Sequence, residues 1–334
     1  MFLGIRDIIH ARGRFTLIGA VVGLITLLLV MLTGLTGGLG AQNTSALSAL
    51  DPDRVVFRSE EPSFTDSQVT ADDVAAWEQV EGVTDVRPLG ALQTRLEADT
   101  TLTVAVLGLP GVGPGAVLPD SLLDSTPHEI LLGGVRVPVA GTAPEGYYSH
   151  SPVVWVDTSV WQEIARTESV GTVLLLDGDA DWEEASARTG TTVSTLRGSF
   201  AGLAAYQSEK GSLQTMQGFL YAISALVIVS FLTVWTIQRT RDLSILRALG
   251  ATPGYLVRDA LGQAAIILAV GVTVGALAGW GLGTLAGQVV PFQLTALTVL
   301  GPALGIWALG LVGAFLATRR VAKVDPLIAL GGNG

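Results

Sequence analysis

The sequence has 334 residues, 49% of them hydrophobic, and a positive mean hydropathy of +0.53, which excludes an ordinary soluble globular domain. Its formal net charge of −10 is unevenly divided: residues 1–40 and 236–334 together hold 10 Lys/Arg against 4 Asp/Glu, whereas residues 41–210 hold 9 against 25. The absence of Cys excludes disulfides, thiolate metal sites and Cys nucleophiles, and the acidic middle argues against a nucleic-acid partner.

Residues 1–14 predict a cytoplasmic amphipathic helix at the inner leaflet, with one face formed by Phe2, Ile5 and Ile9 and the other by Arg6, Asp7 and Arg12. An uncharged run then extends through residues 15–50. A secretory signal peptide is the alternative, but the run is longer than the 7–15 residues expected of its apolar core. We therefore predict a first transmembrane helix that continues outward as a stalk with a polar face at Gln42, Asn43 and Ser45.

Residues 51–198 change to the pattern of an α/β domain, with β-branched strands punctuated by Gly and Pro. A helix is predicted in TADDVAAWEQVEGV, opened by Thr70. Strands are predicted in DRVVF, TLTVAVLGL, EILLGG, VRVPVAG, PVVWV and GTVLLLDG.

Three further apolar runs complete the membrane portion. The predicted elements are a stalk and second span over 199–238, a third span over 256–287, an outer loop over 288–294, a fourth span over 295–318 and a cytoplasmic tail over 319–334. The fold class is therefore an α-helical membrane protein with four transmembrane helices and one α/β extracytoplasmic domain inserted between spans 1 and 2. The basic ends place both termini in the cytoplasm of a multi-pass protein of the cell membrane.

A charged segment over 239–255 separates the second and third spans. Leu243, Leu246 and Leu249 recur every three residues and predict a short amphipathic helix. Gly250 is suited to end that helix, and Thr252 followed by Pro253 to begin the next one. An interfacial helix that only anchors to lipid is the alternative.

Two motifs carry a resemblance. The string RTRDLSILRALGATPGYLVRDAL and the ending RRVAKVDPLIAL resemble FtsX-like permeases, the family that includes the MacB-type exporters. The step from Trp77 to Pro88 resembles the start of the extracytoplasmic domain in MacB-like permeases. The resemblance implies a homodimer with two copies of a separate ABC ATPase. It also implies that 239–255 is the coupling helix, with ATPase contacts at Arg241, Leu243, Leu246, Arg247, Leu249 and Gly250.

Glycine recurs every fourth residue in the third span, which predicts a smooth stripe for close helix packing; its members are Gly271, Gly275, Gly279, Gly283 and Gly287. Gly19 and Gly23 make a shorter stripe in the first span. We expect the long stripe to pack against the fourth span of the same chain, with a dimer contact as the alternative.

No motif indicates an enzyme. The chain contains no GxxxxGK[ST], GxSxG or HExxH sequence, and its histidines at 10, 128 and 150 lie in separate regions. Nucleotide hydrolysis is therefore assigned to a partner chain, and no resident cofactor is predicted.

Candidate substrate-binding residues cluster around the first two spans: Met31, Tyr206, Glu209, Met216 and Tyr221. Met216 lies seven residues beyond Glu209 and is expected on the same helical face, with Tyr221 near that face. The alternatives are core packing for Met31 and Met216, interfacial positions for the tyrosines, and a helix-entry carboxylate at Glu209.

Resemblance to the haem-efflux members of the family implies that these residues line a mostly apolar cleft for haem. Haem iron accepts Met and Tyr as axial ligands, and Met31 is the candidate ligand, with the tyrosines also available and Glu209 a weaker candidate. The predicted function is thus the permease subunit of an ABC-type pump that exports a hydrophobic substrate from the membrane. The alternatives are an FtsX-like signal transducer that activates an extracellular partner, and an exporter of lipid, lipopeptide or antimicrobial peptide.

Overall fold

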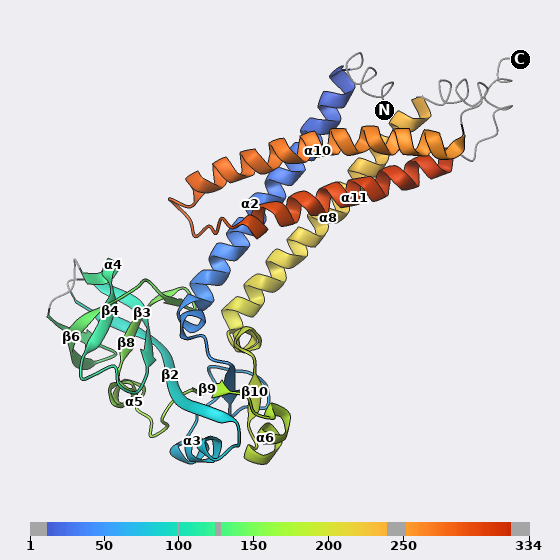
Figure 1. The fold of residues 1–334 in the computed structure, drawn as a ribbon. Helices are drawn as coiled ribbons and strands as arrows, with labels where there is room; N and C mark the ends of the chain where they lie inside the picture. Colours follow the sequence, from blue (N-terminus) through green and yellow to red (C-terminus); the bar gives the residue numbers. More distant parts are fainter. Residues whose placement is uncertain (1–11, 99, 124–127, 239–251, 322–334) are drawn as a thin grey trace, which may run out of the picture. The chain divides into compact units, whose positions relative to one another are not determined.

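A computed structural model describes residues 12–98, 100–123, 128–238 and 252–321. The chain forms two compact units: a helical unit from residues 1–38 and 212–334, and a β-rich unit from residues 39–211. Figure 1 shows the long helices of the first and the sheets of the second. The predicted 1–14 helix is almost wholly outside the described residues, as are the charged segment over 239–251 and the tail from 322 onward.

Four long helices carry runs that are apolar enough to cross a membrane. They are α2 (Arg12–Leu50), α8 (Ala204–Gln238), α10 (Pro253–Ala286) and α11 (Ala296–Val321). Because the β-rich unit lies between α2 and α8 in the chain, the predicted fold class of four spans with one inserted α/β domain is confirmed. The stalk before the second span differs from the prediction: a 3-10 turn over Phe200–Gly202 interrupts it, and α8 begins only at Ala204.

Apolar side chains from all four helices form the core of the helical unit, among them Leu29, Ile228, Leu268 and Ile306. Hydroxyl side chains inside the helices bond to the carbonyl four residues earlier, as Thr26 does to Val22 and Thr318 to Ala314. Such bonds satisfy polar groups where no water is available.

Three glycines of the α10 stripe, Gly271, Gly275 and Gly279, pack against α2. A Cβ atom at Gly275 would lie 2.2 Å from the carbonyl oxygen of Gly23, and one at Gly271 would lie 2.8 Å from that of Gly19. The predicted packing of this stripe on the fourth span is therefore wrong. Glycine spacing shows which residues share a face, but it does not show which helix covers that face.

Helix α11 packs on α10 at other residues. A Cβ atom at Gly310 would meet the Leu268 side chain at 2.6 Å, and the indole N–H of Trp307 donates to the carbonyl of Ala265 at 3.3 Å. At this contact the glycine is on α11, so the glycines of α10 are not needed there and can pack against α2.

The start of α10 follows its prediction. Thr252 caps the helix by accepting from the backbone N–H of Tyr255, and Pro253 occupies the first turn. Proline is tolerated there because its missing N–H would have no partner inside the helix.

One lobe of the β-rich unit is built from two β–α–β units. They comprise β1 (Arg54–Phe57), α3 (Ala71–Glu78) and β2 (Val83–Glu97), then β9 (Val173–Gly178), α6 (Trp182–Thr189) and β10 (Thr192–Ser194). Their strands lie in the antiparallel order β10-β1-β9-β2. Trp77, Val56, Leu174 and Leu176 are buried between this sheet and its helices.

The predicted helix TADDVAAWEQVEGV is shorter than expected. Thr70 opens α3 with a capping box, as predicted, but the helix ends at Glu78. Gly82 then adopts a φ of +90°, and the chain continues as strand β2. A positive φ is accessible to glycine and incompatible with a continuing right-handed helix.

The second lobe is inserted between β2 and β9 and is a closed six-stranded barrel. Its ring runs β2-β3-β8-β4-β6-β5 and returns to β2, which is long enough to belong to both lobes. The added elements are β3 (Thr101–Gly108), β4 (Ala116–Pro119), α4 (Asp120–Leu123), β5 (Glu129–Leu132), β6 (Val135–Ala143), β7 (Tyr147–Tyr148), β8 (Ser151–Val156) and α5 (Thr158–Ala165). Closure leaves the barrel without free edges.

Candidate functional site

The five predicted substrate-binding residues divide between the two units. Met31, Met216 and Tyr221 belong to the helical unit, and Tyr206 and Glu209 to the β-rich unit. Met31 is half-buried on α2. The structure therefore describes two separate groups of candidate residues.

Met216 and Tyr221 lie on different faces of α8, so the shared face predicted for them is wrong. Met216 is 54% exposed, next to the 66% exposed Phe219. Tyr221 is half-buried, and a Cβ atom at Gly305 of α11 would meet its ring at 3.2 Å. The two residues are five positions apart, which at 3.6 residues per turn is a rotation of about 140°.

The face of α8 that meets α2 carries an amide. The side chain of Gln217 donates to the hydroxyls of Thr33 and Thr36 on α2, at 3.4 Å each. An amide inside an apolar span is the signal that would have indicated this contact in the sequence.

Tyr206 is held between two neighbours. Its ring meets Phe200 edge-on at 5.8 Å between centroids, and the ammonium of Lys210 lies 5.2 Å from the ring centroid. Cation–π contact and aromatic packing orient the ring at the start of α8.

Glu209 is the centre of a polar cluster that joins three elements, which we call the Glu209 cluster: Asn43, His150 and Glu209. His150 Nε2 lies 2.7 Å from Glu209 Oε1, and Asn43 Nδ2 donates to Glu209 Oε2 at 3.0 Å. Asn43 is on α2, Glu209 on α8 and His150 in the turn between β7 and β8. The sequence identifies Glu209 as a candidate but not His150, because the two residues are 59 positions apart in the chain.

The turn that carries His150 has an unusual backbone. Ser149 and His150 have φ values of +46° and +64°, a region that residues other than glycine rarely occupy. Their N–H groups donate to the carbonyls of Asn43 and Gln42 on α2, at 3.2 and 2.9 Å. Helix α2 therefore holds the turn in place.

Tyr148 precedes this turn and is excluded as an anionic ligand. Its side chain is buried in the core of the β-rich unit, 5.8 Å from Phe64 between ring centroids. Burial raises the pKa of the Tyr148 phenol far above its ordinary value, because the charged form would lose its solvation. Tyr148 thus stays neutral at physiological pH.

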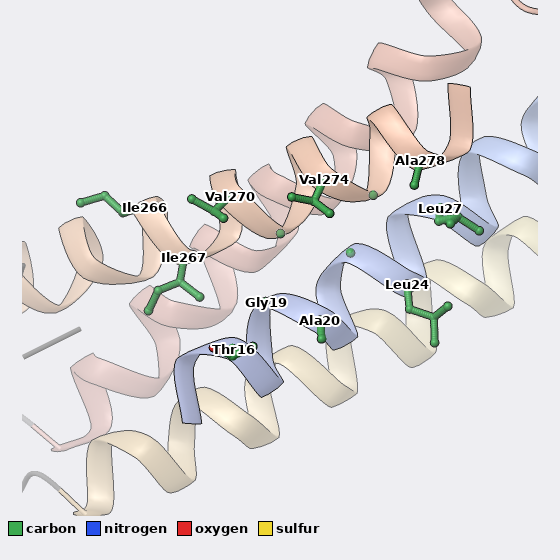
Figure 2. Close-up of a pocket in the computed structure, with 13 residues that line it drawn as sticks. Thr16, Gly19, Ala20, Leu24, Leu27, Ile266, Ile267, Val270, Val274 and Ala278 are labelled. Carbon is green, nitrogen blue, oxygen red and sulfur yellow. The ribbon is translucent and has the colours of Figure 1, made fainter. Parts of the chain in front are cut away.

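An apolar groove of about 590 Å³ runs between α2 and α10 (Figure 2). It is lined by Thr16, Gly19, Ala20, Gly23, Leu24, Leu27, Ile266, Ile267, Val270, Gly271, Val274, Gly275 and Ala278. Figure 2 shows Leu24, Val270 and Val274 on its flanks. A groove of this composition suits a hydrocarbon chain or an apolar ring from the membrane. None of the predicted substrate-binding residues lines it.

Of the predicted iron ligand and ATPase contacts, the structure describes only the iron ligand, Met31. Among the described residues no three His, Asp or Glu side chains come together to hold a metal ion. All six predicted ATPase contacts lie outside the described residues: Arg241, Leu243, Leu246, Arg247, Leu249 and Gly250.

Comparison with known proteins finds a family match in the C-terminal third of the chain. Residues 215–326 match the family described as FtsX-like permease C-terminal. Relatives correspond over the full length of the chain. A putative hemin transport system permease protein, HrtB, of Staphylococcus epidermidis is 22% identical over 100% of both chains, and that of Staphylococcus haemolyticus is 25% identical over 99% of both. An uncharacterized ABC transporter permease of Mycobacterium tuberculosis is 24% identical over 99% of both.

Two solved structures are similar to part of this chain at low TM-scores. The periplasmic region of MacB from Actinobacillus actinomycetemcomitans has a TM-score of 0.35 and 10% identity, covering 43% of this chain and 88% of that one. The extracellular domain of the transporter YknZ from Gram-positive bacteria has a TM-score of 0.31 and 12% identity, covering 41% and 87%.

Proposed function

We propose that this chain is the permease subunit of an ABC-type efflux pump that exports haem from the membrane, with ATP hydrolysed by a separate subunit. The observation that carries the proposal is the end-to-end correspondence with permeases, among them proteins named for hemin transport. The FtsX-like permease domain, the four apolar helices and the absence of a phosphate-binding loop in the sequence are consistent with it. Two copies of the chain with two ATPase subunits make up the proposed assembly.

The chemistry of the candidate residues supports haem as the cargo. Haem is a flat apolar ring with carboxylate edges and an iron atom that accepts Met or Tyr as a ligand. Met31 supplies the thioether in the first span, and Glu209 and Tyr206 supply polar groups in the β-rich unit. Met31 remains the candidate axial ligand. Tyr221 is a weaker candidate because it packs against α11.

A visible-absorption titration of the purified chain with haemin tests the cargo. We expect a shifted Soret band for the wild type, and loss of that shift in Met31→Leu and Glu209→Ala. Leucine keeps the volume of methionine and removes only the sulfur, so Met31→Leu is the better probe of ligation. If the wild type leaves the haemin spectrum unchanged, haem is refuted as the cargo, and the signal-transducer or lipid-export alternatives are favoured.

Efflux from cells tests the coupling role of the segment over 239–255. Leu246→Asp places a charge on the proposed docking face and should abolish haem export while haemin binding persists. Leu246→Met retains the apolar face and is the control. Unchanged export in Leu246→Asp would show that this face does not transmit the work of the ATPase.

A further inference from the structure

We propose that His150 and Asn43 are positioning residues that hold the Glu209 carboxylate in the orientation in which it meets the cargo. The inference rests on the proposed function, because it takes Glu209 to contact the transported molecule. The observation behind it is that both carboxylate oxygens have a donor from a different element: His150 Nε2 at 2.7 Å from Oε1 and Asn43 Nδ2 at 3.0 Å from Oε2.

The donor roles follow from chemistry. A lone pair on His150 Nε2 would face the carboxylate at 2.7 Å, so this nitrogen carries the hydrogen, and its 3.1 Å approach to Asn43 Nδ2 is a contact between two donors, not a hydrogen bond. The amide of Asn43 donates to Glu209 and to the carbonyl of Leu39, at 3.0 and 3.1 Å. A flipped amide would turn its oxygen toward these two acceptors, and this fixes the amide orientation.

The Asn43 donor is held in place by burial, whereas the Glu209 carboxylate remains accessible to solvent. Asn43 is fully buried, whereas the Glu209 side chain is 35% exposed. Each carboxylate oxygen has two lone pairs, so the two donors leave a second acceptor position on each oxygen. Glu209 is therefore oriented by the protein and still open to a ligand.

The position of His150 is itself fixed by the backbone. The left-handed conformation of Ser149 and His150 is held by hydrogen bonds to α2, the helix that also supplies Asn43. Sparsely populated backbone conformations persist where surrounding contacts over-determine them, and they concentrate at functional sites. Here the strained turn places the His150 imidazole beside the Glu209 carboxylate.

A double-mutant cycle in the full-length chain tests the inference. Haemin affinity should fall about 10- to 100-fold in His150→Ala, the loss typical of residues that orient a ligand-binding group. In a Glu209→Gln background the same substitution should cause no further loss, because His150 acts only through the carboxylate. His128→Ala, an exposed histidine of the same domain, is the matched control. An additive loss in the double variant, or an unchanged affinity in His150→Ala, would overturn the inference.

A second measurement keeps the inference independent of the cargo. Carbodiimide labelling of Glu209, followed by mass spectrometry, should be slow in the wild type and faster in His150→Ala and Asn43→Ala. Equal labelling in all three chains would refute the positioning role even if haemin binds. If the wild type does not bind haemin, the proposed function is refuted. The labelling rates then test by themselves whether His150 positions the Glu209 carboxylate. His150→Asn, which tolerates the left-handed backbone, replaces the alanine variant should that variant fail to fold.

Discussion

At the scale of single residues, Asp73 connects a helix start to the sheet beside it. Its carboxylate accepts from the backbone N–H of Thr70 at 2.8 Å and from the guanidinium of Arg58 at 2.7 Å. Burial alone would raise the pKa of Asp73. The hydrogen bonds from Thr70 and Arg58 outweigh it, so the pKa is lowered.

The lowered pKa predicts a pH-dependent stability. The carboxylate stabilises the folded state above the unfolded-state pKa, and this contribution is lost as pH falls through the folded-state pKa. Asp73→Ala should therefore lower the free energy of unfolding by about 1–2 kcal/mol at neutral pH, as other lost caps do. The difference from wild type should shrink below the ordinary pKa of 3.8. Denaturant titrations followed by tryptophan fluorescence measure both effects.

Asp72 provides the control for this experiment. It is the exposed neighbour on the same first turn of α3, where an acidic side chain interacts favourably with the helix dipole. Asp72→Ala should have a much smaller effect. Equal destabilisation by the two substitutions would show that the capping box and Arg58 contribute nothing specific.

At the scale of helices, the contact between α2 and α10 depends on the absence of side chains. Gly275→Leu should force the two backbones apart, because even a Cβ atom there would lie 2.2 Å from the Gly23 carbonyl oxygen. Gly281→Leu adds the same side chain to the same helix where a Cβ atom meets nothing within 4 Å. We expect a lower melting temperature in lipid nanodiscs for Gly275→Leu only. Similar melting temperatures for the two variants would contradict close packing of α2 on α10.

Element type was more predictable from the sequence than element pairing. The four long helices follow from uncharged runs, and the caps at Thr70 and Thr252 from residues within one turn, because these signals are local. The barrel was not foreseen. Its closure depends on β2 pairing with β5, through contacts between residues 34 and 36 positions apart. No periodicity within a strand specifies such a partner.

The same limit applies to the candidate site. Glu209 stands out as a carboxylate at the entry to an apolar span, and this much is local information. Its partners Asn43 and His150 are 166 and 59 residues away, so only the folded chain brings them together. For Tyr221 the limit is different: helical spacing from Glu209 predicts that it lies near the face of Met216, but the rotation of about 140° between Met216 and Tyr221 separates their faces.

At the scale of the whole molecule, the chain passes between the two units only twice, after residue 38 and after residue 211. Both passages are within helices, α2 and α8. Gly211 stands at the second passage, is exposed, and offers open space for a Cβ atom. Packing therefore does not require glycine there, and glycine costs a helix about 1 kcal/mol relative to alanine.

A substitution that stiffens α8 at Gly211 tests whether bending of the helix there is part of the proposed transport. Gly211→Ala should stabilise α8 and, if α8 bends during the cycle, reduce haem efflux several-fold. Gly218→Ala is the matched control, since Gly218 is equally exposed and open but lies seven residues inside the helical unit. It should stabilise the helix to the same extent and leave efflux unchanged. Equal efflux from both variants would exclude bending at Gly211 as a step in transport.

The charge distribution predicts the orientation of the whole chain. Positive residues are retained on the cytoplasmic side of a membrane, so the Lys/Arg excess of residues 1–40 and 236–334 should face inward and the acidic β-rich unit outward. The native chain has no Cys, so each introduced thiol is unique. A membrane-impermeant maleimide applied to intact cells should label Glu183→Cys, which alters an exposed residue of α6. It should reach Ser244→Cys only after the membrane is permeabilised. Labelling of Ser244→Cys from outside would show the opposite orientation, and the proposed coupling segment would then be out of reach of a cytoplasmic ATPase.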